Sequence, residues 1–301
     1  MHRAPLLPLL SLLAALQSAT AAPDPKTPLP PPTNTASATW CRFVPERCDD
    51  FAWENDLMAF RAYGPAILKT GGSEGSGIDC WFKRVKYPII DRWYDGAAHG
   101  LSYHIDRGEG HDPYHTGASR GCGGLGIWKD GKMIVSGPYK EWKIISREPD
   151  KSVFELTYDY DLDGTPVHEV KRVTIELGKR LFRVDSTFSQ GGKPADLDIA
   201  VGITTHDGKA AANLNPGQGW MACWEKIAGH GVGTGVAIDP GKLKSMTEIK
   251  SAAKDASHAL LVTHTDATGT VTYYAGQAWE GAGEITTPAA WEAYLAAWPR
   301  H

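Results

Sequence analysis

A thirteen-residue stretch of the chain, residues 103–115, concentrates side chains that can transfer protons or bind metal ions. Imidazole and carboxylate groups placed close together suit proton transfer near neutral pH, coordination of a divalent metal ion, or a polar surface loop. The sequence leaves these three interpretations open. In the string YHIDRGEGHDPYH, the histidines and acidic residues are His104, Asp106, Glu109, His111, Asp112 and His115.

The metal interpretation depends on spacing. His111 and His115 are four residues apart, as two metal ligands on one face of a helix would be. Two glycines and a proline interrupt the stretch, so a helix is not expected and a helical metal motif is excluded. A divalent-metal site formed by a loop stays open, and the histidines favour a transition metal over calcium. Its candidate ligands are His104, Asp106 and Glu109, together with His111 or His115.

The proton-transfer interpretation centres on His104. If residues 101–106 end a β-strand, the two-residue period places His104 and Asp106 on one side and Tyr103 on the other. We therefore expect His104 to act as a general acid or base held by a nearby carboxylate, with Tyr103 or Tyr114 as a proton donor.

A second histidine, His206, ends a predicted strand and stands beside Asp207. It is expected either to act with His104 across a sheet face, or to be an ordinary turn histidine whose hydrogen bonds are satisfied. The sequence does not decide between these two roles.

Two earlier segments mix charged and aromatic side chains. Residues 49–65 read as one strand, in which Arg61 either forms an internal ion pair or contacts a ligand, because buried charge needs a partner. Residues 76–96 interleave basic and aromatic residues, which suits a sugar acid: aromatic faces pack on sugar rings, and Arg or Lys pairs with the carboxylate. The residues predicted to bind substrate are Trp53, Asn55, Arg61, Arg84, Asp106, Glu109, His115 and Arg120, and Tyr87 is a further candidate proton donor.

Strand signals dominate the elements that must position these residues. β-rich runs separated by short glycine-containing turns cover residues 153–162, 168–177, 181–189, 197–207 and 269–279, and a hairpin is predicted over 126–135. Only residues 288–298, which follow a threonine, have a clear helix signature. Many strands with little helix predict a mostly β fold, built as an antiparallel sandwich or barrel.

The chain is expected to have three parts. Residues 1–21 have a basic start, an apolar run and a small-x-small cleavage site, so they predict a secretory signal peptide and an exported protein, periplasmic or secreted. The apolar run is too short to span a bilayer, and no membrane insertion is expected. Residues 22–39 form a Pro/Thr-rich linker, and residues 40–301 form a single folded domain.

Composition limits the class of partner. The 301-residue chain is 42% hydrophobic, enough for a substantial core, and its net charge is −4. A slightly acidic protein without clustered lysine and arginine argues against a nucleic-acid partner. The five cysteines are odd in number, so at least one is free or paired outside the chain.

Four long strings resemble a known family. They are ERCDDFAWENDLMAFRAYGP, SGIDCWFKRVKYPIIDRWY, YHIDRGEGHDPYHTGASRGCGG and the late YYAGQAW followed by GEITTPAAWEAYL. Together they make the chain similar, over almost all of its length after the linker, to the DUF4861 family of exported bacterial proteins. The resemblance implies a galactose-mutarotase-like supersandwich of large antiparallel sheets, with a short C-terminal helix. In the family pattern a second histidine stands at the position of Arg107 in this chain. The resemblance therefore implies roles for His104, Asp106 and Glu109, and any role of that second histidine is missing here.

The resemblance also implies work on oligosaccharides. We expect a lyase or dehydratase that acts by β-elimination on uronic-acid-containing oligosaccharides. The roles required are neutralisation of the carboxylate, a base for the C5 proton, and an acid for the departing oxygen. The candidates for the base are His104 and His206, and those for the acid are Tyr87 and Tyr103. The alternatives are an aldose mutarotase or epimerase, which would use the same residues, and a non-catalytic carbohydrate-binding protein, which would use only the aromatic ones.

Overall fold

The computed structural model describes residues 27–30, 32–72 and 75–299. The predicted signal peptide, residues 1–21, lies outside the described residues. The first strand begins at Trp40. In the described ranges, no helix combines the length and the apolar character needed to cross a membrane.

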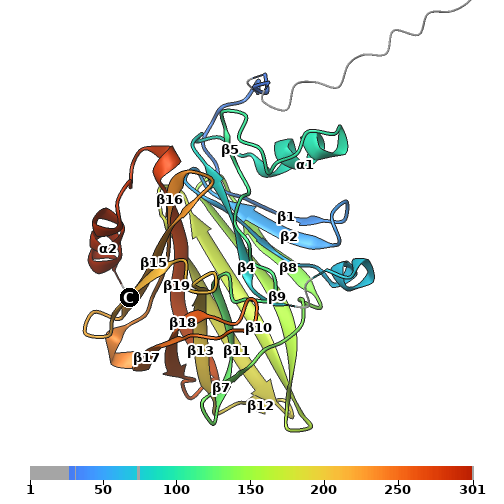
Figure 1. Ribbon diagram of the computed structural model, residues 1–301. Coiled ribbons are helices and arrows are strands. Elements are labelled where there is room, and N and C mark those ends of the chain that lie inside the picture. The colour runs from blue at the N-terminus through green and yellow to red at the C-terminus, as the bar shows by residue number, and fades with distance from the viewer. Residues whose placement is uncertain (1–26, 31, 73–74, 300–301) are drawn as a thin grey trace, which may run out of the picture.

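A small antiparallel sheet forms the N-terminal part of the fold (Figure 1). The expectation of one strand over residues 49–65 is wrong, because the chain turns back after Glu54. The Asn55 side chain accepts the backbone N–H groups of Leu57 and Met58 at 2.8 and 3.0 Å, which stabilises this turn. The sheet runs in the order β1 (Trp40–Val44), β2 (Asp50–Glu54), β3 (Ala59–Ala62), β4 (Ile78–Lys83) and β5 (Gly110–His111).

A large antiparallel sheet forms the centre of the molecule. Strands β9, β10 and β11 are long and alternate between buried and exposed residues, as strands with one face on the core must. In spatial order the sheet contains β14 (Ala211–Asn215), β15 (Trp220–Ile227), β16 (His230–Ala237), β19 (Thr270–Trp279), β11 (Leu181–Gln190), β10 (Thr165–Glu176), β9 (Lys151–Leu162) and β8 (Trp142–Arg147), and β12 (Lys193–Pro194) pairs with β11.

A third antiparallel sheet packs over the large one. Its order is β17 (Leu243–Ile249), β18 (His258–His264), β13 (Asp198–Thr204), β6 (Cys122–Lys129) and β7 (Lys132–Ile134). One continuous apolar core joins the three sheets, and it includes Phe51 from the small sheet, Val184 from the large sheet and Val201 from the third. Burial of this core is the main force that holds the sheets together.

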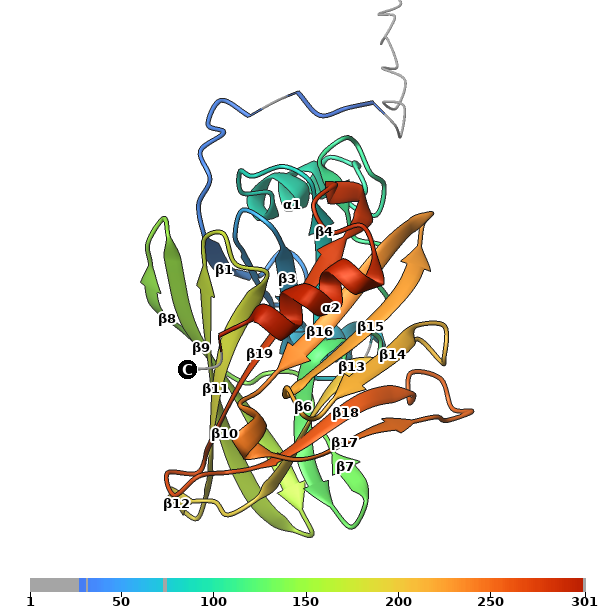
Figure 2. The ribbon, with the colours of Figure 1, turned by 90° about the vertical axis from the view of Figure 1, so that its left-hand side faces the viewer.

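Helices are few in the described chain. Helix α2 (Pro288–Ala297) confirms the helix predicted after Thr287, whose side chain accepts the Ala290 N–H. Figure 2 shows α2 lying across the large sheet, where Trp291 packs against the glycines of β16. Helix α1 (Ile90–Ala98) is not predicted from the sequence. The remaining helical turns are η1 (Pro65–Thr70), η2 (Pro240–Lys242) and η3 (Glu280–Ala282).

The predicted fold class is confirmed: the protein is mostly β, with large antiparallel sheets and a short C-terminal helix. The hairpin predicted over residues 126–135 is the β6–β7 pair. The long runs predicted as strands are β9, β10, β11, β13 and β19.

A loop between β5 and β6, residues 112–121, joins the small sheet to the third sheet. It starts and ends where the chain passes very close to β4. A Cβ on Gly110 would lie 2.0 Å from the carbonyl oxygen of Phe82, and one on Gly121 would lie 2.0 Å from that of Ile78. Both glycines also have positive φ, which other residues adopt at a cost. The sequence therefore fixes both ends of this loop.

His258 holds the same loop from β18 and makes stability dependent on pH. Its Nε2 accepts the backbone N–H of Arg120 at 3.1 Å, and burial, with the nearby Arg120 charge, lowers its pKa from 6.5 to about 4. Below pH 6.5 His258 takes up a proton in the unfolded chain, whereas in the folded protein it stays neutral until about pH 4. The free energy of unfolding is therefore expected to fall by up to about 3 kcal/mol between these two pH values.

Urea denaturation at several pH values measures this loss. In His258→Gln the amide oxygen can still accept the Arg120 N–H, but nothing titrates, so the drop between pH 6.5 and 4 should shrink. His99→Gln, at an exposed histidine, should leave the drop unchanged. Equal pH profiles for the two variants would contradict the assignment to His258.

Candidate active site

A cleft of about 390 Å³ lies where four segments of the fold converge. Pro113 and His115 come from the loop after β5, and a turn after β13 supplies a second group of residues. The end of β15 and the loop between β17 and β18 complete the cleft. Its lining residues are Pro113, His115, His206, Asp207, Lys209, Glu225, Lys226, Ile227, Ala228, Lys254 and Asp255.

His115 is an accessible imidazole with a fixed orientation. Its Nε2–H donates to Asp255 Oδ1 at 2.9 Å, and the other carboxylate oxygen accepts the Ala118 N–H at 3.2 Å. The His115 side chain is 56% exposed, whereas that of Asp255 is 13% exposed. Because the carboxylate holds the proton on Nε2, the lone pair of Nδ1 is left to accept another proton. This is the arrangement of a general base held by a carboxylate.

His206 lies beside His115 but has different partners. Its Nδ1 is hydrogen-bonded to a carboxyl oxygen of Glu225, and its Nε2–H donates to the backbone carbonyl of His115 at 2.7 Å. Both ring nitrogens are therefore engaged by neighbouring residues. The Tyr114 ring packs edge-on against it with 4.7 Å between centroids. His206 therefore fixes the His115 backbone and has no nitrogen left for proton transfer.

Four residues that line the cleft have a left-handed backbone: His206, Asp207, Ala228 and Asp255. His206 has φ of +46° and Asp255 has φ of +63°, in the left-handed region that side chains with a Cβ rarely adopt. Such conformations persist where the surroundings impose them, and they gather at functional sites. Two of them hold His115: Asp255 binds its imidazole, and His206 binds its backbone carbonyl.

Three lysines give the cleft a cationic rim. Lys209, Lys226 and Lys254 are exposed, and each comes from a different segment. Two of the carboxylates in the cleft are already hydrogen-bonded to imidazoles, as described above. The ammonium groups are therefore available to a negatively charged ligand.

The structure separates His104 from this cleft. Residues 101–109 do not form the predicted strand, so the expected pairing of His104 with Asp106 on one strand face is wrong. The His104 side chain is 60% exposed, and its Nδ1–H donates to the backbone carbonyl of Asp112 at 2.6 Å. It contacts Tyr103 and not His206, so the predicted partnership of the two histidines is also wrong. The catalytic role expected for His104 stays a prediction.

The three candidate metal ligands do not come together. His104 binds the Asp112 carbonyl, Asp106 pairs with Arg84 and accepts backbone N–H groups, and Glu109 is enclosed by other donors. Within the described ranges, no group of three or more His, Cys, Asp or Glu side chains has the arrangement of a metal site. The predicted metal loop is therefore corrected to a set of separate contacts.

Five residues predicted to contact substrate are internal instead, because each is almost fully buried and its position is fixed by the fold. Trp53 lies in the aromatic core, and the Asn55 amide donates to two backbone carbonyls. Glu109 accepts hydrogen bonds from Tyr87, Arg92 and Trp93. The five are Trp53, Asn55, Arg61, Glu109 and Arg120, with 0–5% exposure.

Of the three tyrosines expected as proton donors, Tyr114 is buried, and its hydroxyl has no hydrogen-bond partner among the described residues. The Tyr87 hydroxyl donates to Glu109 at 2.7 Å, and burial together with this carboxylate raises its pKa to about 12, which weakens it as an acid. The Tyr103 hydroxyl accepts from Arg61 at 3.3 Å. Arg84 stays partly exposed, paired with Asp106 and placed over the Trp279 ring at 4.7 Å.

Sequence reasoning missed several lining residues of the cleft. Glu225 had one available signal, since it follows five buried or partly buried apolar residues in β15 and interrupts this run. Asp255 and the lysines lie in turns or at strand ends and carry no motif, so only the folded chain brings them to His115.

Comparison with known proteins places the chain in a family. A model of the family described as "Domain of unknown function (DUF4861)" matches residues 20–301. The chain belongs to the DUF4861 family. This DUF4861 chain is also 36% identical over 274 residues to "Uncharacterized protein P7" of Formosa agariphila, covering 86% of this chain and 67% of that protein.

Among solved structures, the DUF4861 chain matches the GH36 alpha-galactosidase AgaB from Geobacillus stearothermophilus. The TM-score is 0.39 at 10% identity, and the match covers 85% of this chain. The chain spans 43% of the length of that enzyme.

Proposed function

We propose that this DUF4861 protein is a carbohydrate-active lyase that performs β-elimination on a uronic-acid residue of an oligosaccharide. The observation that carries the proposal is His115: an exposed imidazole, oriented by Asp255, in an open cleft with a cationic rim. The family resemblance of the motifs points in the same direction.

The lysines supply the first requirement of the reaction. A uronate carries a carboxylate on C5, and its negative charge opposes removal of the neighbouring proton. Pairing that carboxylate with Lys209, Lys226 or Lys254 offsets this charge and stabilises the enolate-like intermediate. A neutral sugar would gain nothing from these ammonium groups.

The proton transfers then follow from the state of each side chain. His115 Nδ1 takes the C5 proton, a double bond forms between C4 and C5, and the C4–O bond breaks. The departing oxygen takes a proton from a rim ammonium group or from water. His206 holds the His115 backbone through the step, because its Nε2–H donates to the His115 carbonyl.

The same geometry argues against mutarotation. That reaction needs a carboxylate base and a histidine acid at the anomeric carbon. Glu225 and Asp255 are both engaged by imidazoles, and among the carboxylates that line the cleft this leaves Asp207, on an exposed turn. Elimination needs an imidazole base and cations, which the cleft has.

The test is direct. The protein is incubated with oligogalacturonate and with oligoalginate, and the ultraviolet absorbance of the unsaturated uronate is followed. We expect a steady rise with at least one of these substrates. A flat trace with both, with faster anomeric equilibration of a reducing sugar, would replace elimination with mutarotation.

We also propose that the protein is exported, as the first 21 residues suggest. Mass spectrometry of the protein purified from a bacterial periplasm or medium would find an N-terminus near Ala22. An intact N-terminal Met1 in the cytoplasm would contradict export.

A further inference from the structure

A second cavity lies on the outer face of the large sheet, away from the apolar core. On β11 and β19, Val184 and Tyr273 point into the core, so the alternate residues Arg183 and Tyr274 point outward. One hollow of about 190 Å³ and another of about 380 Å³ share these two residues. We call the combined surface the outer groove. It has no lining residue in common with the cleft around His115.

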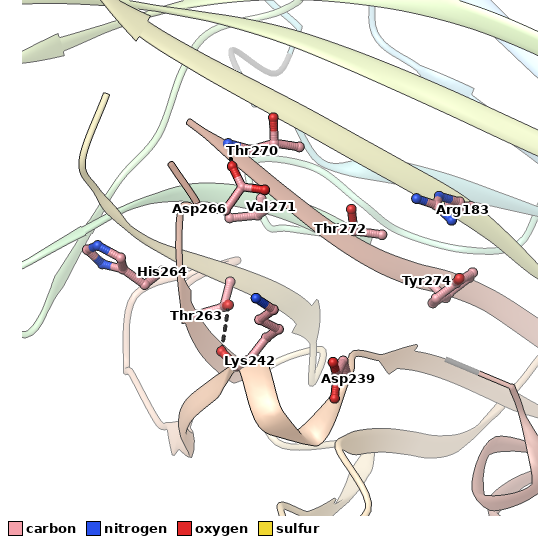
Figure 3. Close-up of a pocket in the computed structure, with 10 residues that line it drawn as sticks. All are labelled: Arg183, Asp239, Lys242, Thr263, His264, Asp266, Thr270, Val271, Thr272 and Tyr274. Carbon is pink, nitrogen blue, oxygen red and sulfur yellow. Dashed lines mark hydrogen bonds between the residues drawn. The ribbon is translucent and has the colours of Figure 1, made fainter. Parts of the chain in front are cut away.

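The two walls of the outer groove differ. Figure 3 shows Lys242 and Asp239, from the segment between β16 and β17, on one wall and Arg183, Thr272 and Tyr274 on the other. The Arg183 guanidinium donates to both oxygens of Asp185, and Thr272 donates to the same carboxylate at 2.7 Å. Asp185 is thus paired, and of the carboxylates that line the groove, Asp239 and Asp266 accept backbone N–H groups.

Lys242 is an exposed cation of the outer groove, which Lys151 also lines. The Lys242 ammonium has no hydrogen bond, and no carboxylate lies within 4 Å among the residues that the structure describes. Its backbone carbonyl, by contrast, accepts the Thr263 hydroxyl at 2.8 Å, so its place in the chain is held. An unpaired cation on a fixed segment favours an anionic ligand.

Aromatic and hydroxyl groups complete the surface. The Trp298 ring lies 5.7 Å from that of Tyr274 and is partly exposed, and Lys179 lies over it at 5.8 Å. Threonines 174, 270 and 272 add hydroxyl groups along the groove. An apolar ring face, hydroxyl partners and a cation match the ring, hydroxyls and carboxylate of an acidic sugar.

We propose that the outer groove binds a segment of anionic polysaccharide, as a second site separate from the cleft. Such a site would keep a long polymer on the protein while its end reaches the cleft. The binding does not depend on which reaction the cleft performs, and it would hold for a protein that catalyses none.

Native gel electrophoresis in gels that contain polygalacturonate, alginate or neutral galactan tests the proposal. The wild type should be retarded by at least one acidic polymer and not by galactan. Lys242→Gln removes one exposed ion pair with the polymer and should weaken this retardation about fivefold. Trp298→Ala should have an effect of similar size. Lys132→Gln, which removes an equal charge from an exposed position on β7, is the matched control.

Each result decides the proposal. Retardation equal in Lys242→Gln and Lys132→Gln, retardation of the wild type by neither acidic polymer, or equal retardation by galactan would overturn it. His115→Ala should bind the polymer as the wild type does, and loss of retardation there would assign binding to the cleft instead. Turnover of a short uronate oligosaccharide should be unchanged in Lys242→Gln, so failure of the outer groove and failure of the cleft chemistry give different results.

Discussion

Replacing His115 by alanine is expected to lower kcat on a uronate oligosaccharide at least about a hundredfold, because a positioned general base commonly contributes that much or more. The imidazole is exposed, so its loss removes few packing contacts and the melting temperature should change little. The measurement is the initial rate of unsaturated-product formation, together with a thermal unfolding curve.

Three further variants sharpen this prediction. Asp255→Asn should also reduce kcat, because an amide no longer fixes the tautomer that leaves Nδ1 free. His99→Ala, at an exposed histidine after α1, should leave the rate unchanged. His104→Ala separates the two candidate bases. If it abolishes turnover while His115→Ala is active, the base is His104 and the cleft mechanism is wrong.

Replacing Arg61 by methionine is expected to destabilise the protein by about 3–5 kcal/mol, the usual cost of removing one partner from a buried ion pair. Its guanidinium donates to Asp79 at 2.5 Å and to Asp112 at 3.1 Å, and Asp50 lies 3.7 Å away. All three carboxylates are buried. Without the arginine they would repel one another in a medium that solvates them poorly.

The effect should depend on pH in a defined direction. Burial raises the pKa of Asp50 to about 6, and burial with the neighbouring Asp79 raises that of Asp112. Removing Arg61 raises both further, so the variant takes up protons above pH 6, before wild type does, and its deficit in the free energy of unfolding should shrink as the pH falls from 8 to about 6.

Urea denaturation of both proteins at pH 5 and pH 8 measures this difference. The matched control is Arg172→Met, which breaks an exposed pair with Glu155 and should cost less than about 1 kcal/mol. A cost for Arg61→Met as small as that of the control would show that the buried charges are not coupled through this arginine.

The sequence predicted the fold better than the site, for a physical reason. Strands such as β9 and β10 can be predicted from the local sequence, because apolar side chains at every second position must face a core. The internal ion pair of Arg61 was one of two alternatives open in the sequence, and the structure decides for it. The prediction of a single strand over residues 49–65 is wrong because the Asn55 side chain closes a turn within the segment. The alternation of side chains along the sequence gives no sign of this turn.

The candidate site could be predicted only in part. His115 and His206 stood out by residue type, yet His104 stood out equally, and all three belong to polar, turn-rich segments. What separates them is the partner of each ring: a carboxylate from residue 255, a carboxylate from residue 225, or a backbone carbonyl from residue 112. These partners come from distant strands and loops, and no local pattern encodes such pairings.

The loop of residues 112–121 connects the cleft to the buried ion pairs of Arg61 through two neighbouring residues. His115 faces the cleft, while Thr116 donates to Asp79, which also binds the buried Arg61. Moving the base would therefore require disturbing a charged cluster in the interior. A ligand that enters the cleft should meet an imidazole already in its working position, with little motional freedom left to lose. The affinity of the ligand should then depend on the contacts that it forms, because little conformational entropy is lost in ordering the loop. Backbone hydrogen exchange in residues 112–121 should already be slow before any sugar is added.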